Sequence, residues 1–137
     1  GDTPKILTPH MGEMVRLSGH SVEELKQKPL ELAAAYAKEH EVILVLKDAR
    51  TVVTDGERIV LNTTGNNGMA TGGSGDVLTG IITGLLAQGM APFEAAVSGV
   101  YLHGLAGDRA AENTGVRGML STDLLKELPG VLKEGYQ

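Results

Sequence analysis

The sequence predicts an α/β fold in which helices cover a mainly parallel β-sheet. Segments with strand and helix patterns alternate along the 137 residues, as they do when helices connect parallel strands. The run Val42–Leu46 is continuously aliphatic, which is typical of a strand buried on both faces of a parallel sheet. A chain of this length can form one domain around a single core.

Short elements are expected before the aliphatic run. Lys5–Thr8 has the pattern of a strand, and Glu13–Ser18 has that of a small helix. Ser21 and Glu24 have the spacing of a capping box, in which each side chain bonds to the backbone of the other residue, so a second short helix should begin there. The alanine-rich segment Pro29–His40 is expected to form a longer helix.

A hairpin and long helices are expected after the run. Thr51–Thr54 and Arg58–Leu61 flank Asp55-Gly56, a pair that favours a tight turn between antiparallel strands. One long helix should end before Gly89, and another should begin at Pro92 and reach about Asn113. Ser121-Thr122-Asp123 is expected to cap a last helix. Small residues on the two long helices should let them pack backbone to backbone; these are Gly80, Gly84, Gly99, Gly104 and Gly107.

The expected sheet has few strands. Only Lys5–Thr8 and Val42–Leu46 are expected to be parallel, whereas an α/β sandwich usually contains more strands. The chain is therefore expected to be part of a domain whose earlier strands are missing. Alone, it should fold poorly or only with a partner and should not catalyse, because a buried strand needs cover on both faces and a neighbour on each side.

Composition narrows the classes of function. The net charge of −5 argues against nucleic acid as a partner. Cysteine is absent, which excludes thiol chemistry and fits a cytoplasmic protein. The longest apolar run, Val42–Leu46, is far too short to cross a bilayer. We therefore expect a cytoplasmic protein that binds neither nucleic acid nor membranes.

The glycine-rich stretch Gly65–Asp76 carries the strongest functional signal. Glycines allow backbone N–H groups to converge on one point without clashes of Cβ atoms. The helix that follows adds the positive end of its dipole, so this point favours an anion such as phosphate. Asp76 places a carboxylate beside it, which suggests phosphoryl transfer in which the acid takes a proton from the attacking hydroxyl.

The alternative for Asp76 is a structural role as the N-cap of the helix, where Asp is favoured. A cap needs at most one glycine, so the many glycines favour the functional interpretation. Two common phosphate motifs do not match. Leu78 stands where a dinucleotide fingerprint requires glycine, and no lysine follows these glycines as a Walker loop requires.

His10 follows the first expected strand, and Lys47 ends the aliphatic run. In open parallel sheets, ligands bind beyond the carboxyl ends of the strands, so both residues fall where a ligand would bind. Each also has an ordinary explanation, His10 as a turn or helix-entry residue and Lys47 as a solvated lysine.

Other polar residues are interpreted as structural. His20, His40 and His103 lack convergent carboxylates in the sequence, and Asp108 fits a surface or polar-packing residue within a helix. The spacing of His, Asp and Glu does not predict a transition-metal site. Mg²⁺ would arrive with the phosphates of a nucleotide rather than bind to a cage built by the protein.

The chain closely resembles a known family in five segments: Leu7–Glu13, Lys47–Thr51, Asn62–Gly80, Tyr101–Asp108 and Thr122–Leu125. These segments are similar to the ADP/ATP-dependent NAD(P)HX dehydratases of the ribokinase-like superfamily. The resemblance covers essentially the whole chain, and the glycine-rich stretch is highly specific. It implies a ribokinase-like α/β/α sandwich, of which residues 1–137 form the C-terminal portion.

The resemblance implies a metabolite repair enzyme, a lyase that restores NADH or NADPH after hydration of the nicotinamide ring. ADP or ATP, with Mg²⁺, phosphorylates the hydroxyl, and phosphate then leaves as the ring double bond re-forms. The expected partners are hydrated NADH or NADPH, ADP or ATP, the N-terminal half of the same domain, and further copies in a homo-oligomer.

The resemblance also implies roles for individual residues. Asp76 matches the catalytic aspartate, which also contacts the substrate, and His10 matches a position that contacts the hydrated dinucleotide. The anion hole around the transferred phosphoryl group corresponds to Gly73, Ser74 and Gly75. Nucleotide-binding positions correspond to Lys47, Asp48, Ala49, Arg50, Thr51 and Gly75.

Three positions depart from the family pattern. Asp48 stands where the family usually has glycine, and Met11 and Asn67 stand where proline is usual or common. The carboxylate of Asp48 would repel nucleotide phosphates unless it points away, and glycine allows a closer backbone approach. Asp48 therefore bears on nucleotide affinity and leaves the family assignment intact.

Two other functions fit the same residues. A small-molecule kinase of the vitamin-precursor type shares the glycine and aspartate cradle but releases a phosphorylated product. A non-catalytic nucleotide-binding fragment would bind nucleotide without turnover.

Overall fold

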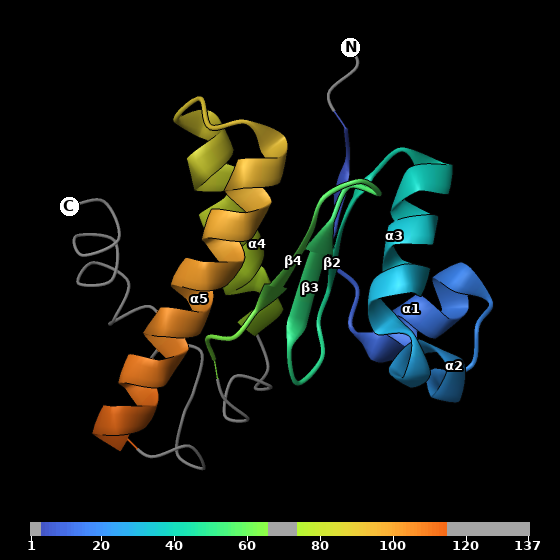
Figure 1. Ribbon diagram of the computed structural model, residues 1–137. Helices are drawn as coiled ribbons and strands as arrows, with labels where there is room; N and C mark the ends of the chain where they lie inside the picture. Colours follow the sequence, from blue (N-terminus) through green and yellow to red (C-terminus); the bar gives the residue numbers. More distant parts are fainter. Residues whose placement is uncertain (1–3, 66–73, 115–137) are drawn as a thin grey trace. The chain divides into compact units, whose positions relative to one another are not determined.

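The computed structural model describes residues 4–65 and 74–114, which divide between two units. The first unit holds residues 1–62 and 91–97, and the second holds residues 63–90 and 98–137. Strands and short helices make up the first unit, and the second contains most of the two long helices (Figure 1).

Four strands of the first unit form one sheet in the order β1-β2-β3-β4. They are β1 (Ile6–Leu7), β2 (Ile43–Leu46), β3 (Thr51–Thr54) and β4 (Ile59–Asn62). β1 and β2 are parallel, whereas β2–β3 and β3–β4 are antiparallel. The described sheet is therefore mixed. All four residues of β2 are buried, as the aliphatic run predicts, and β2 has a strand on each side.

The predicted hairpin joins β3 to β4. Thr54 pairs with Ile59, so residues 55–58 form the connection. The Asp55 carboxylate accepts hydrogen bonds from the backbone N–H groups of Glu57 at 3.0 Å and Arg58 at 2.7 Å. Gly56 has φ of 100°, a left-handed conformation that residues with a Cβ rarely adopt.

Three helices of the first unit are α1 (Met11–Ser18), α2 (Val22–Gln27) and α3 (Pro29–His40). α3 has the predicted bounds. α1 begins before the predicted Glu13, because His10 caps it and starts the helical turn earlier. Side chains from these helices and from the sheet form a buried core: Met14, Leu25, Ala33, Ala37, Leu44, Leu46 and Val52.

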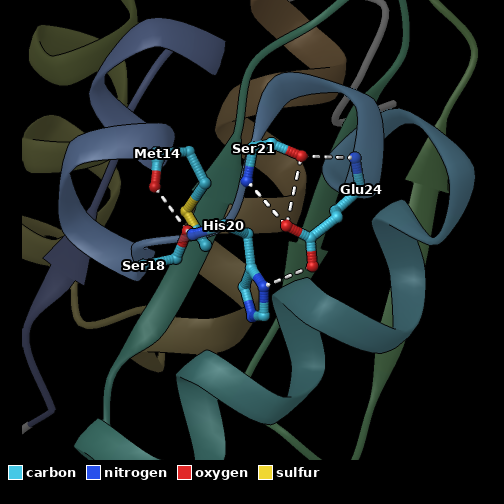
Figure 2. Close-up of polar contacts among 5 residues, drawn as sticks. All are labelled: Met14, Ser18, His20, Ser21 and Glu24. Carbon is cyan, nitrogen blue, oxygen red and sulfur yellow. Dashed lines mark hydrogen bonds and ion pairs between the residues drawn. The ribbon is translucent and has the colours of Figure 1, made fainter.

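The predicted capping box at the start of α2 is confirmed. The Ser21 hydroxyl accepts from the Glu24 N–H at 3.1 Å, and the Glu24 carboxylate accepts from the Ser21 N–H at 3.1 Å (Figure 2). That backbone N–H, with the side chains of His20 and Ser21, lowers the pKa of Glu24. His20 contacts the Glu24 carboxylate at 3.3 Å, so the expectation that no carboxylate lies near it is wrong, while the contact itself belongs to the helix cap and is structural.

The second unit contains α4 (Ser74–Ala87) and all but the first residues of α5 (Pro92–Thr114). Close packing is confirmed at Gly99, where a Cβ would lie 2.6 Å from the Ile82 side chain. The prediction of close packing is wrong for Gly80 and Gly84, where a Cβ would meet no described atom within 4 Å. These two glycines lie on the exposed side of α4, which the spacing alone does not reveal.

Two further predictions about helices concern Gly104 and the cap at residues 121–123. A Cβ on Gly104 would clash with Thr64, so this glycine admits a loop and not a second helix. The predicted cap at Ser121-Thr122-Asp123 lies outside the described residues. None of the helices in the described ranges is long and apolar enough to cross a membrane.

We predict that Gly56→Ala destabilises the protein more than Gly19→Ala does. Both glycines have positive φ, 100° and 77°, and the left-handed conformation costs a residue with Cβ about 1–2 kcal/mol. At Gly56 a Cβ would also lie 2.8 Å from the backbone Cα of Lys38, whereas at Gly19 it would meet no described atom within 4 Å. Urea denaturation of both variants measures the difference, expected to be roughly 1–3 kcal/mol. Equal losses would show that the hairpin moves away from α3 at little cost.

Candidate active site

The carboxyl ends of β1 and β2 bring His10 and Lys47 together. The two residues form a parallel bridge, and the Lys47 N–H donates to the Pro9 carbonyl at 2.9 Å. The parallel pairing puts the ends of both strands at one edge of the sheet. The predicted placement of His10 and Lys47 on a common edge is therefore confirmed.

His10 is a helix-entry residue with an exposed side chain. Its Nδ1 accepts from the Glu13 N–H at 3.2 Å, and the Glu13 carboxylate accepts from the His10 N–H at 3.1 Å. This backbone N–H, together with the nearby positive charges, lowers the pKa of Glu13. The capping box fixes the ring while 60% of the side chain stays exposed, so the structural role leaves the ring accessible to a ligand.

Residues 47–50 connect β2 to Thr51, the first residue of β3, at the same edge. Lys47 and Thr51 are half-buried, while the three residues between them, Asp48, Ala49 and Arg50, are exposed. The predicted nucleotide-binding segment is thus a short, accessible connection beside His10. The exposed position of Asp48 allows its carboxylate to remain solvated.

The start of α4 carries the other predicted site residues. Ser74 is the first residue of the helix and is buried, Gly75 is half-buried, and Asp76 is exposed in the first turn. The alternative interpretation of Asp76 as the N-cap is wrong, because the helix begins before it. Gly73 lies outside the described residues.

The chemistry of this helix start suits a phosphate. The first N–H groups of a helix have no acceptor within the helix, and they point toward the positive end of the dipole, where anions bind. Within residues 4–65 and 74–114, His, Asp and Glu side chains do not form a group of three or more that could hold a metal ion. The backbone N–H donors at the start of α4 fit nucleotide phosphates, which would bring Mg²⁺ with them.

His103 contacts the predicted anion hole, which the sequence did not reveal. Its Nε2 lies 3.2 Å from the Ser74 hydroxyl. Asp108 accepts from the Gly65 N–H at 3.1 Å, which agrees with its interpretation as a polar-packing residue. The likeness of Tyr101–Asp108 to the family was the available signal, but it did not indicate what His103 touches.

A cavity in the first unit lies away from these residues. It has a volume of about 380 Å³ and lies at the opposite ends of β1 and β2, beside Arg58, Phe93 and Glu94. Arg58 stacks on the Phe93 ring at 4.0 Å and pairs with Asp55 at 2.8 Å and Glu94 at 3.3 Å. Its charge is therefore already compensated by carboxylates, and the cavity is a poor site for phosphate.

The described residues form an α/β protein in which the sheet of the first unit has polar residues at its strand ends, and helix α4 of the second unit has a carboxylate in its first turn. The chain belongs to the NAD(P)H-hydrate dehydratase family, whose sequence profile matches residues 2–130. The predicted family is thereby confirmed.

Individual relatives agree with this assignment. The chain is 54% identical over 132 residues to the bifunctional NAD(P)H-hydrate repair enzyme Nnr of Moorella thermoacetica, covering 95% of this chain and 25% of that protein. The ADP/ATP-dependent NAD(P)H-hydrate dehydratase of Bacillus subtilis, co-crystallized with ATP/Mg²⁺, matches with a TM-score of 0.91 and 38% identity over 96% of this chain and 48% of that one.

The predicted fold is confirmed by the same comparison. A ribokinase-like superfamily protein from Enterococcus faecalis matches with a TM-score of 0.84 and 37% identity, over 96% of this chain and 45% of that one. The fold is therefore ribokinase-like. The chain spans less than half the length of each of these three relatives.

We predict that His10→Ala destabilises the protein by about 1 kcal/mol, whereas His10→Asn does not. Asn can accept the Glu13 N–H as an N-cap, and Ala removes the acceptor that His10 now provides. The free energy of unfolding in urea decides between the two outcomes. Ser21→Ala and Ser21→Asn at the cap of α2 are the matched controls. Equal stability of both His10 variants would show that this cap contributes nothing measurable.

Proposed function

We propose that residues 1–137 are the C-terminal portion of a domain that dehydrates hydrated NADH and NADPH with ADP or ATP. The observation that carries the proposal is the start of α4, where the exposed carboxylate of Asp76 lies in the first turn, beside helix N–H groups of the kind that favour an anion. Membership of the NAD(P)H-hydrate dehydratase family supports the choice of substrate.

Asp76 is the proposed catalytic base. The substrate hydroxyl oxygen attacks the terminal phosphorus of the nucleotide, the bond from that phosphorus to the bridging oxygen of the shortened nucleotide breaks, and Asp76 takes the hydroxyl proton. The carbon–oxygen bond then breaks, phosphate departs, and a proton leaves the neighbouring ring carbon as the double bond re-forms. The exposed position of the carboxylate in the first turn makes it accessible to the hydroxyl.

The helix start is the proposed anion hole. The N–H groups of Ser74 and Gly75, together with that of Gly73, stabilise the negative charge on the transferred phosphoryl group. Donors fixed in place before the reaction do this without reorganisation, which gives such sites their catalytic effect. The nucleotide phosphates would hold Mg²⁺, which would supply further positive charge there.

The edge of the first unit is the proposed binding site for the rest of both ligands. His10 contacts the hydrated dinucleotide through its exposed ring, and Lys47–Thr51 bind the nucleotide together with Gly75. The shared edge of β1 and β2 supports this pairing of roles, since ligands of open α/β sheets bind beyond strand ends.

The remainder of the domain is the proposed partner. The chain spans 48% of the Bacillus subtilis dehydratase, so further strands and the rest of the substrate wall would come from outside these residues. We further propose a cytoplasmic homo-oligomer, in keeping with a cysteine-free chain.

The proposal is tested by mixing hydrated NADH with the complete domain, ADP or ATP, and Mg²⁺. The absorbance of NADH should return. A stable phosphorylated product would indicate a small-molecule kinase instead. Nucleotide binding without turnover would indicate a non-catalytic fragment.

We predict that Asp76→Asn lowers turnover by about 10²–10⁴-fold and leaves nucleotide affinity nearly unchanged. The amide preserves the shape of the first turn but cannot accept the hydroxyl proton. Steady-state rates and calorimetric titration with ADP and ATP measure the two effects. Turnover within a few-fold of the parent protein would show that Asp76 has only a structural role.

We predict that Asp48→Gly tightens nucleotide binding or leaves it unchanged. The substitution removes a negative charge from the proposed nucleotide segment and frees the backbone for a closer approach. Asp48→Asn is the matched control, because it removes the charge alone. A clear loss of ADP or ATP affinity in calorimetry would mean that the Asp48 carboxylate makes a favourable contact.

A further inference from the structure

Helix α5 contacts the glycine-rich stretch near both of its ends. At the N-terminal end, the Thr64 hydroxyl donates to the Tyr101 carbonyl at 3.2 Å, and the Gly65 N–H donates to the Asp108 carboxylate at 3.1 Å. Near the C-terminal end, the Ser74 hydroxyl lies 3.2 Å from His103 Nε2. All of these residues belong to the second unit.

The face of α5 that meets Thr64 and Gly65 is built for close contact. Tyr101, Gly104 and Asp108 have the i, i+3, i+7 spacing of one helical face. A Cβ on Gly104 would lie 2.8 Å from the Thr64 carbonyl carbon, far closer than real side chains allow. Glycine at this position therefore lets the backbone of Thr64 lie against the helix.

The contact between His103 and Ser74 involves the Ser74 hydroxyl and not its backbone N–H. Ser74 is 6% exposed, and it meets His103 through its side chain. The N–H that we assign to the phosphoryl group is therefore not the group that His103 contacts. Ser74 and Asp76 share the first turn of α4, so whatever locates Ser74 also locates the catalytic carboxylate.

We propose that His103 and Asp108 are positioning residues for phosphoryl transfer. Asp108 anchors Gly65 and His103 anchors Ser74, so the helix sets where the anion hole and Asp76 stand relative to the nucleotide. This inference rests on the proposed function. Geometry of this kind matters because catalytic donors must be held within about 0.5 Å of their productive position.

Four variants of the complete domain test the proposal. His103→Leu and Asp108→Ala remove the side-chain hydrogen-bonding groups, whereas His103→Gln and Asp108→Asn retain them. We expect turnover to fall about 10- to 100-fold in the first pair and to stay within about threefold of the parent in the second. Affinity for ADP and ATP should fall in the first pair, while affinity for AMP, which lacks the transferred phosphoryl group, should hold.

Ser74→Ala removes the other partner of the His103 contact and supplies a second route if His103→Leu does not fold. The losses from Ser74→Ala and His103→Leu should not add in the double variant, because both changes break the Ser74–His103 contact. Thermal unfolding of every variant checks that the fold is retained.

Three results would overturn the inference: parental turnover in His103→Leu and Asp108→Ala, equal losses in the conservative and non-conservative variants, or an equal loss of AMP and ADP affinity. Failure of the proposed function would give a different experimental result. In that case the parent domain itself would not restore NADH from its hydrate with ADP or ATP.

Discussion

The burial of β2 constrains the arrangement of the first unit. All four of its residues are buried, and every backbone N–H and C=O group on such a strand must find a partner, because an unpaired buried polar group is costly. β1 and β3 supply those partners on either side. The parallel pairing with β1 then places His10 beside Lys47, so the packing of an apolar strand decides where two polar residues meet.

The structural and functional interpretations of His10 are compatible. A ring that accepts a backbone N–H through Nδ1 is held in one orientation by its own helix. The ring Nε2 lies 3.2 Å from the Glu13 carboxylate, and 60% of the side chain is exposed. A residue positioned in this way loses little conformational freedom when a ligand binds, and this lowers the cost of binding.

The proposed site residues of the second unit come from segments far apart in the chain. α4 supplies Ser74 and Asp76, and α5 supplies His103 and Asp108. Gly99 and Gly104 show why α5 can serve this purpose, since one admits Ile82 of α4 and the other admits Thr64. The exposed Gly80 and Gly84 have no such contact with described atoms, although the sequence presents all four in the same way.

The sequence by itself determined the features that depend on neighbouring residues. The capping box at Ser21, the turn at Asp55-Gly56 and the bounds of α3 involve residues a few positions apart, whose patterns are local. The family followed from long motifs, which retain their order whatever the fold around them. Tertiary structure alone decided that β2 pairs with β3 as an antiparallel neighbour, and that Ser74 and His103 touch. Contacts between distant residues depend on how whole elements pack, and a local pattern carries no record of the partner across the fold.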